Sequence, residues 1–423
     1  MTKKAIIIGG GIGGAVASLA IKKAGFDVEI YEARSESATS TGWFLNLAGN
    51  GIEILRTLDI DAKINQEGSP APRMIISNAE GKPLGEVRNG ARNGLTESVI
   101  IRRGTLQEAL YEAVLAQDIP FHFGKKLCDI KHLDDQTVMA SFEDGTRASG
   151  DLLVGADGIH SCVRQIINPN APKPEYSGLV STGGFTRPME VLPTPKTQYF
   201  IFGKRAFFGY HVRASGEIYW FNNHAYEKEP DPAELASLTN EEWKQALLKM
   251  HADDLPLLKK IIRSTDAGIG AFPIYDIASQ PTWYKGSIVL IGDAVHAISP
   301  SSGQGASLAM EDAVILAKCL RDIQSLDQAF AKYQTLRRDR VEAVVKWGRT
   351  FGGAKIMSNP IQVWFRDHMM PFFLKFAAKP EALDWVYGYE IDWDERVSDE
   401  EPRTSLRETL LNFLGHRSLA QNT

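Results

Sequence analysis

Cysteine is scarce in this chain, which has three in 423 residues. Cys128, Cys162 and Cys319 lie far apart and form no CxxC pair, so neither a zinc site nor a disulfide framework is indicated. Such sparse cysteines are typical of reduced packing residues, and we therefore expect no metal and a cytoplasmic location.

Long apolar runs and an excess of basic charge are also absent. No segment approaches the roughly 18 apolar residues that suggest a membrane span, and the apolar stretch after Lys4 is too short for a signal peptide. The net charge is −5 and the pI is near 6.0, which disfavours nucleic acid or an anionic membrane as a bulk partner. With 43% hydrophobic residues, the chain can build a large core, and its length allows two or three domains.

The first thirty residues have the pattern of a strand, a helix and a second strand. A short apolar strand at 5–8 meets a run of glycines. An alanine-rich helix over 15–24 follows, closed by Gly25, and then a strand at 27–31. Further helices are predicted at 50–58, 105–115 and 306–320, and further apolar strands at 152–154 and 286–293.

The middle of the chain has a different character. Between 176 and 273, short aromatic and β-branched runs alternate with turns, which predicts an antiparallel sheet. One helical stretch, about 240–263, interrupts these runs, and the chain from about 330 is mostly helical in pattern.

The glycine run fits GxGxxG through Gly9, Gly11 and Gly14, with Gly13 between them. The first glycine permits a tight turn, the second lets a pyrophosphate approach the backbone, and the third lets helix and strand pack closely. Glu32 follows the second strand at roughly the 20 residues expected of a carboxylate that binds a ribose 2′-hydroxyl. Because this motif lies between a predicted strand and a predicted helix, it indicates a site for FAD or NAD and disfavours NADP there.

Three further motifs follow in order. They are Arg103-Gly104-Thr105-Leu106, then Gly155-Ala156-Asp157-Gly158 with Ser161 and Arg164 after it, and then Gly292-Asp293 with Pro300, Gly303, Gln304, Gly305 and Ala306. With the glycine motif, they resemble the flavoprotein monooxygenases that have the fold of para-hydroxybenzoate hydroxylase. The resemblance is closest to the salicylate- and urate-hydroxylase-like branch and extends from Lys4 to about Tyr389.

The resemblance implies a role for each motif. Arg103 reaches the flavin nucleotide, Asp157 holds backbone near the pyrophosphate, and Asp293 binds the ribityl chain. The loop with Pro300, Gly303, Gln304 and Gly305 passes beside the isoalloxazine, and no side chain is assigned as catalytic because the flavin performs the chemistry. The expected FAD contacts are Gly9, Gly11, Gly13, Gly14, Glu32, Arg34, Arg103, Asp157, Gly158, Gly292, Asp293, Pro300, Gly303, Gly305 and Ala306.

The resemblance also implies a reaction. NADPH or NADH binds transiently and reduces FAD, O2 adds at flavin C4a as a hydroperoxide, and one oxygen atom enters a small aromatic or polycyclic substrate by hydroxylation or epoxidation. The absence of a second GxGxxG in strand and helix context agrees with transient nicotinamide binding. The alternatives are a reductase or dehydrogenase of an isoprenoid or quinone, and a non-catalytic FAD protein that binds a hydrophobic ligand. A halogenase is disfavoured because the Trp-x-Trp-x-Ile-Pro signature is absent.

Substrate contacts are harder to name. The candidates are four residues on predicted strands, namely Tyr210, His211, Trp220 and Asn222. Because side chains alternate between the two faces of a strand, at most half of them can face the flavin. His296 is either a packing histidine or a catalytic base. The aromatic segment 363–376 is interrupted by charged residues and proline, so a helix over the substrate cavity or a subunit interface is favoured above membrane contact, in a monomer or homodimer.

The fold class that follows is α/β. We expect a Rossmann-like FAD domain of the glutathione-reductase type, with an inserted β-sheet substrate domain and a helical C-terminal region. The expected FAD domain comprises 1–72, 98–175 and 276–345, the substrate domain 73–97 and 176–275, and the helical region 346–423.

Overall fold

The structure of the protein is a computed structural model. It describes residues 2–36, 42–90, 96–133, 137–191, 194, 196–266, 268–277, 280–353, 359–377 and 383–397. Within these residues the strands form one sheet of six strands, one of seven and two of three. The predicted α/β class and the inserted sheet are confirmed.

The six-stranded sheet belongs to the dinucleotide-binding part of the chain. Its order is β18 (Tyr284–Lys285), β19 (Ile288–Leu290), β12 (Leu152–Gly155), β1 (Lys4–Ile8), β2 (Asp27–Tyr31) and β8 (Phe121–His122). The pairings from β19 to β8 are parallel, and β18 alone is antiparallel in this sheet. β1 and β12 are almost wholly apolar and buried, as expected of parallel strands that are covered on both faces.

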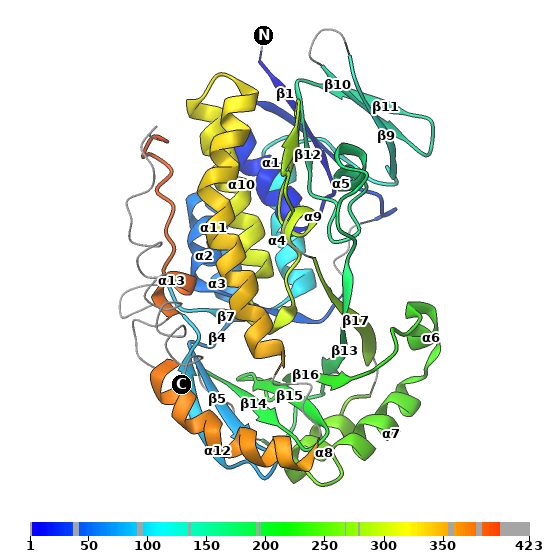
Figure 1. The fold of residues 1–423 in the computed structure, drawn as a ribbon, viewed down its shortest axis with the longest axis vertical. Helices are drawn as coiled ribbons and strands as arrows, with labels where there is room; N and C mark the ends of the chain where they lie inside the picture. Colours follow the sequence, from blue (N-terminus) through cyan, green and yellow to red (C-terminus); the bar gives the residue numbers. More distant parts are fainter. Residues whose placement is uncertain are drawn as a thin grey trace, which may run out of the picture.

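Three helices pack together beside this sheet. They are α1 (Ile12–Lys23), α4 (Arg103–Ala116) and α10 (Gly305–Asp322), and α1 lies between the other two (Figure 1). α5 (Cys162–Ile167) and a small antiparallel sheet of β9 (Leu127–His132), β10 (Val138–Phe142) and β11 (Arg147–Gly150) lie at the other side of the view. The first helix begins three residues earlier than predicted, because the glycine run itself supplies its first turn.

The seven-stranded sheet forms the other half of the molecule (Figure 1). Its order is β17 (Gly270–Asp276), β13 (Glu175–Phe185), β16 (Ile218–Ala225), β15 (Ala206–Val212), β14 (Thr197–Phe202), β5 (Arg73–Asn78) and β6 (Pro83–Arg88). All its pairings are antiparallel except that of β14 with β5, which is parallel. Two chain segments that are distant in sequence thus build one sheet.

The helices of this half are α6 (Pro232–Ser237), α7 (Asn240–Met250) and α8 (Pro256–Arg263). The helical stretch predicted over 240–263 is present as two helices, α7 and α8. Pro256 lacks a backbone N–H and sits at the start of α8, where a missing donor costs nothing, so the chain ends one helix and starts another.

A small sheet joins the two halves. It contains β3 (Phe44–Leu47), β7 (Val99–Arg102) and β4 (Ser69–Pro70), with α2 (Gly49–Thr57) and α3 (Asp61–Glu67) nearby. Side chains alternate along β3, so Leu47 enters the core of the FAD half, whereas Phe44 packs on aromatic rings of the seven-stranded sheet.

The C-terminal part is helical, with α11 (Leu326–Gly353), α12 (Pro360–Ala377) and α13 (Asp384–Tyr387). The expected domain boundary between 345 and 346 falls inside α11, so the two regions share one helix. No helix among the described residues has the length and apolar character to cross a membrane.

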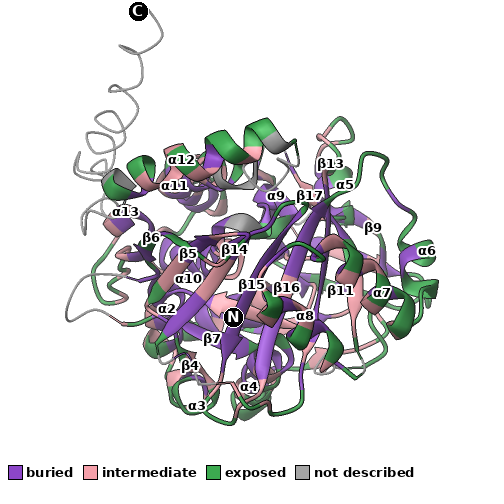
Figure 2. Ribbon diagram, turned by 90° about the horizontal axis from the view of Figure 1, so that it is seen from below, coloured by how far each residue is buried: buried purple, intermediate pink, exposed green. Residues whose placement is uncertain are grey.

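α12 packs against β6, and Leu374 and Arg366 of this helix are buried. By contrast, Ile361, Trp364, Phe365, Phe372 and Phe373 are 56–77% exposed, and much of the α12 ribbon is coloured as exposed (Figure 2). These side chains therefore do not line a cavity under the helix.

Candidate FAD and substrate site

The glycine run after β1 is shaped by close backbone contacts. A Cβ on Gly9, whose φ is +101°, would lie 2.4 Å from the carbonyl oxygen of Ala156, and one on Gly14 would lie 1.9 Å from the carbonyl oxygen of Gly9. By contrast, nothing lies within 4 Å of a Cβ placed on Gly11. The first and third glycines are therefore required by packing, while the second leaves backbone open to a ligand at the N-terminus of α1.

Two further glycines let α10 approach this turn. A Cβ on Gly292, whose φ is +57°, would lie 2.8 Å from Cβ of Ala309 in α10. A Cβ on Gly13 would lie 3.3 Å from the same atom. The start of α1, the Gly292 turn and α10 thus meet at one methyl group, which brings motifs far apart in sequence to one place.

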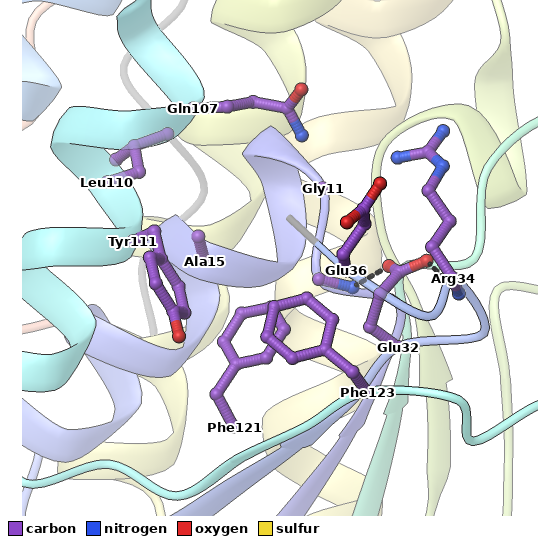
Figure 3. A pocket seen from close by; sticks show the side chains of 11 residues that line it. Gly11, Ala15, Glu32, Arg34, Glu36, Gln107, Leu110, Tyr111, Phe121 and Phe123 are labelled. Atoms are coloured by element: carbon purple, nitrogen blue, oxygen red, sulfur yellow. Dashed lines mark hydrogen bonds between the residues drawn. The ribbon is translucent and has the colours of Figure 1, made fainter. Parts of the chain in front are cut away.

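A pocket opens beside the glycine turn and α4 (Figure 3). The Glu32 carboxylate accepts hydrogen bonds from the backbone N–H of Gly10 (2.7 Å) and of Arg34 (2.9 Å), which fixes its position at the end of β2. Phe121 and Phe123 form an aromatic wall with ring centroids 4.6 Å apart. The lining residues are Gly10, Gly11, Ala15, Glu32, Arg34, Glu36, Gln107, Leu110, Tyr111, Phe121 and Phe123.

Gln107, Tyr111, Phe121 and Phe123 were not predicted as site residues. Gln107 is 8% exposed, and its side-chain oxygen has no hydrogen-bond partner. A buried unpaired acceptor beside aromatic rings and a carboxylate suits a flat base with an attached ribose. The Phe-x-Phe spacing on one face of the strand after α4 is the signal that can find this wall in a sequence.

Arg103 and Asp293 lie close enough for their charges to influence each other. Both side chains are accessible to solvent. Even so, desolvation raises the pKa of the Asp293 carboxyl and lowers the pKa of the Arg103 guanidinium, and the charge of each partly offsets the shift of the other. The charge of Arg34, which lines the pocket, also lowers the pKa of Arg103, so Arg103 lies near that pocket.

The Asp157-Gly158 turn lies at the end of β12. Burial raises the pKa of Asp157, whose carboxylate accepts from the backbone N–H of Val163 at 3.1 Å and keeps one oxygen unpaired. Gly158 has a φ of +79°. Arg164 donates to the carbonyl oxygens of Ala294 (2.8 Å) and Ile159 (2.7 Å), which ties this turn to the segment after Asp293.

The loop before α10 closes the site. Pro300–Ser302 form a 3-10 turn, Gly303 has a φ of +62°, and Gln304 precedes the first residue of α10, Gly305. Gln304 is fully buried and its side-chain oxygen accepts from Asn50 Nδ2 at 3.0 Å. Gly305 and Ala306 are partly exposed. The N-terminus of α10 is therefore accessible, and its partial positive charge faces the space beside the loop.

A buried network of ion pairs fixes the position of α10. Asp312 accepts from Gly292 N–H (2.9 Å), from Arg337 Nε (2.7 Å) and from His296 Nε2. Burial by itself raises the pKa of Asp312, but the charges of His296 and Arg337 outweigh it and lower the pKa to about 2. Glu311 is paired in the same network with Arg337 and Arg340. His296 is thus bonded within the core, which favours the packing role over that of a base.

Comparison with known proteins identifies the family. The family described as FAD binding domain matches residues 2–348. The chain belongs to this family of FAD-dependent monooxygenases. It is 30% identical to the aurachin C monooxygenase/isomerase of Stigmatella aurantiaca, over 86% of this chain and 93% of that protein. It is 31% identical to a FAD-dependent urate hydroxylase of Klebsiella pneumoniae, over 81% of this chain and 88% of that protein.

A solved structure agrees with this assignment. Klebsiella pneumoniae HpxO complexed with FAD and uric acid superimposes with a TM-score of 0.77 at 25% identity, over 90% of this chain and 97% of that chain. FAD is the cofactor of the family, and the open backbone at Gly11 and the unpaired oxygens of Gln107 and Asp157 fit such a group.

Three of the four predicted substrate contacts of this monooxygenase lie together, but on the face of the sheet that is packed against helices. Tyr210, Trp220 and Asn222 lie on the face of the seven-stranded sheet that α7 and α8 cover. Trp220 is fully buried and donates to Thr265 Oγ1 at 2.9 Å, and Asn222 accepts from His251 Nε2 at 2.8 Å. The expectation that they face the flavin is corrected, because residues of one parity on these strands all point to the helices.

His211 has the other parity but is also occupied. Its ring nitrogens contact Ser69 Oγ at 2.7 Å and the carbonyl oxygen of Thr197 at 2.9 Å, and the side chain is 1% exposed. Burial lowers the pKa of His211. The ring therefore ties β15 to β4 and to the start of β14.

The sheet face toward the FAD half carries a half-buried aromatic set that was not predicted. Phe44 of β3 lies with its ring centroid 6.1 Å from Phe221 and 6.4 Å from Phe185. Phe221 itself lies across Gly209, where any Cβ would come within 2.3 Å of its ring. Phe221 is one residue after Trp220, and a shift of one residue along a strand changes the face.

Proposed function

We propose that this monooxygenase uses FAD, O2 and NADH or NADPH to hydroxylate a small aromatic or polycyclic substrate that binds between the loop before α10 and the aromatic face of the seven-stranded sheet. The observation that carries the proposal is that β3 links the two parts: Asn46 Nδ2 lies 3.4 Å from a Cβ placed on Gly303, and Phe44, on the same face of β3, packs against Phe221 of the seven-stranded sheet. The relatives act on ring compounds by their names, and the HpxO structure contains uric acid.

We assign the parts of FAD to the motifs as follows. The N-terminus of α1 and Gly11 bind the pyrophosphate, and Glu32 accepts hydrogen bonds from the ribose beside Phe121 and Phe123. Asp293 and Arg103 bind the ribityl chain and the nucleotide. The loop from Pro300 to Gly305 flanks the isoalloxazine, and the N-terminus of α10 stabilises negative charge on its pyrimidine edge.

FAD, once reduced, supplies the activation of O2 in this family. The protein's own part is to hold the ring substrate and to exclude water. Phe44, Phe185 and Phe221 are apolar and stacked edge to face or tilted, so they shield one side of the cleft. We also propose a cytoplasmic monomer or homodimer, which the negative net charge and the three free cysteines support.

The test is oxygen consumption by the purified yellow protein. A panel of small hydroxylated arenes is added with NADH or NADPH in an oxygen electrode, and products are identified by mass spectrometry in 18O2. A substrate that stimulates oxygen uptake and gains one 18O atom supports the proposal. Turnover of a substrate without O2 supports the reductase alternative. The non-catalytic alternative is supported if the protein binds FAD and a ligand but the ligand does not stimulate NAD(P)H oxidation.

The cofactor assignment predicts a phenotype for Asp293→Ala. Loss of hydrogen bonds to a carboxylate, each worth about 1.5–3 kcal/mol, lowers FAD affinity at least tenfold. The FAD to protein ratio after purification measures this, with Asp253→Ala as a control because Asp253 forms an exposed ion pair with Arg205. Full FAD occupancy in Asp293→Ala contradicts the ribityl assignment.

A further inference from the structure

Two asparagine side chains form a reciprocal amide pair across the two halves of the molecule. Asn46 of β3 donates from Nδ2 to Asn89 Oδ1 at 2.9 Å, and Asn89 donates from Nδ2 to Asn46 Oδ1 at 2.7 Å. Asn46 belongs to the small sheet beside α10, whereas Asn89 follows β6 of the seven-stranded sheet. The pair therefore bridges the two halves of the molecule.

Hydrogen bonds within the fold fix both the side chain and the backbone of Asn89. It is fully buried, its second N–H donates to the carbonyl oxygen of Ala71 at 2.7 Å, and its backbone N–H donates to the carbonyl oxygen of Pro72 at 2.7 Å. This set of bonds defines which end of the Asn89 amide carries oxygen, and the pair then defines the orientation of Asn46.

Asn46 has hydrogen-bonding capacity left over. It is partly exposed, and its amide has one further N–H and one further oxygen lone pair for which the described residues show no partner. Its Nδ2 lies 3.4 Å from the point at which a Cβ on Gly303 would sit, so the free N–H is next to the loop before α10. Phe44, two residues earlier on the same face of β3, belongs to the aromatic wall.

We propose that Asn46 is a specificity-determining residue, whose free side-chain N–H donates a hydrogen bond to an oxygen on the substrate ring, and that Asn89 is the positioning residue that aims it. This inference rests on the proposed function, because it places the substrate between Gly303 and the aromatic wall. A neutral N–H group can donate a hydrogen bond either to a hydroxyl oxygen or to an ionised oxygen of the ligand. Such a ring oxygen also supplies electron density to the neighbouring carbon that is to receive oxygen.

Matched ligand pairs test the contact without turnover. The oxidised FAD-bound protein is titrated with 1-naphthol and naphthalene, and with 4-hydroxyquinoline and quinoline, while the flavin absorbance difference spectrum is followed. We expect the oxygenated member of at least one pair to bind about tenfold tighter, which corresponds to about 1.4 kcal/mol. In Asn46→Leu, which keeps the shape of the side chain, this preference falls to about twofold while Kd of the unsubstituted member is unchanged.

Two further variants separate recognition from a structural role. Asn46→Asp keeps an acceptor for Asn89 but has no N–H, so it weakens binding of the naphthol most strongly at pH values at which the ligand is ionised. A pH-dependent loss of this kind does not arise from a loosened domain contact. Asn65→Leu, on the exposed side of α3, is the matched control and leaves every Kd unchanged.

Several outcomes overturn the proposal. They are the absence of a preference in the wild type, the absence of any spectral response to the oxygenated ligands, and an equal loss for both members of a pair in Asn46→Leu. A fall in FAD content of Asn46→Leu assigns the N–H to the flavin and overturns it as well. If the preference depends on Asn46 but no ligand stimulates oxygen uptake, the proposed function fails while the recognition by Asn46 stands.

Discussion

The two faces of the seven-stranded sheet are built from the same kinds of residue and are used differently. On the face under α7 and α8, Phe208 and Trp220 stack at 5.3 Å, and both are fully buried. On the face toward the FAD half, Phe44, Phe185 and Phe221 are only half-buried. The closed face is covered by helices of its own domain, whereas the other face, the open face, shares an apolar cluster with Leu374 of α12 at Phe207 and leaves these three rings partly exposed.

The polar groups follow the same division. Under α7 and α8, Asn222, His251 and Asp254 form a chain of 2.8 Å hydrogen bonds in which each member has its partners within the fold. On the open face, His211 is also bonded at both ring nitrogens, whereas Asn46 of the adjacent strand β3 keeps hydrogen-bonding capacity for which the described residues show no partner. Full satisfaction indicates a structural role and partial satisfaction indicates a binding role.

The largest expected loss of stability comes from removing the central ring of the closed face, that of Trp220. Trp220→Ala deletes a fully buried indole and the hydrogen bond to Thr265, and such truncations cost about 3–5 kcal/mol. We expect a large fall in the urea midpoint of unfolding, followed by far-UV circular dichroism. Trp364→Ala is the control, because Trp364 is 61% exposed on α12 and its loss shifts the midpoint little. Equal shifts in the two variants contradict the assignment of the closed face to stability.

The buried histidine of the closed face predicts a pH dependence. Desolvation, and then the charge of His251, lower the pKa of His224 from 6.5 to about 4. In the folded state His224 Nδ1 accepts from Asn222 Nδ2, and protonation removes that acceptor. Between pH 6.5 and 4 the unfolded state therefore binds more protons, so stability is complete above pH 6.5 and falls by on the order of 3 kcal/mol as the pH drops to 4.

The measurement is urea unfolding of wild type and His224→Asn at pH 7.5, 6, 5 and 4. Other groups titrate in both proteins, so the difference between their slopes isolates His224. We expect the variant to lose stability less steeply than the wild type below pH 6.5. Parallel curves show that His224 does not couple folding to protonation.

The features predicted well from the sequence are local or rest on a motif. Gly9, Gly14 and Glu32 are separated by one strand and one helix, so their arrangement follows from short-range geometry that recurs whenever this pattern occurs. Asp293 and the loop to Gly305 are far from them in sequence, and their placement follows from the resemblance to a family and not from spacing. The structure brings both sets to the start of α1 and α10.

The features that sequence reasoning missed depend on which way a side chain points. Every residue between Ala206 and Val212 is buried, so hydrophobicity along β15 has no alternation from which to assign a face. Gln107 and Tyr111 join Phe121 in the pocket only because α4 packs against α1. The sequence around Asn89 does not indicate its role, because that role depends on a contact with Asn46, which is distant in sequence.

The smallest expected effect on stability is on the open face. Phe221 is half-buried, so Phe221→Ala removes less contact than Trp220→Ala although it is the neighbouring residue, and we expect a cost of about 1–2 kcal/mol. Its effect on ligands is the larger one, because the ring that shields the cleft is lost. Titration of the oxidised protein with 1-naphthol gives a Kd raised about tenfold, while naphthol affinity in the folded fraction of Trp220→Ala changes little. If Phe221→Ala lowers the urea midpoint as far as Trp220→Ala does and leaves Kd unchanged, both faces of the sheet are structural, and the substrate binds elsewhere in the cleft.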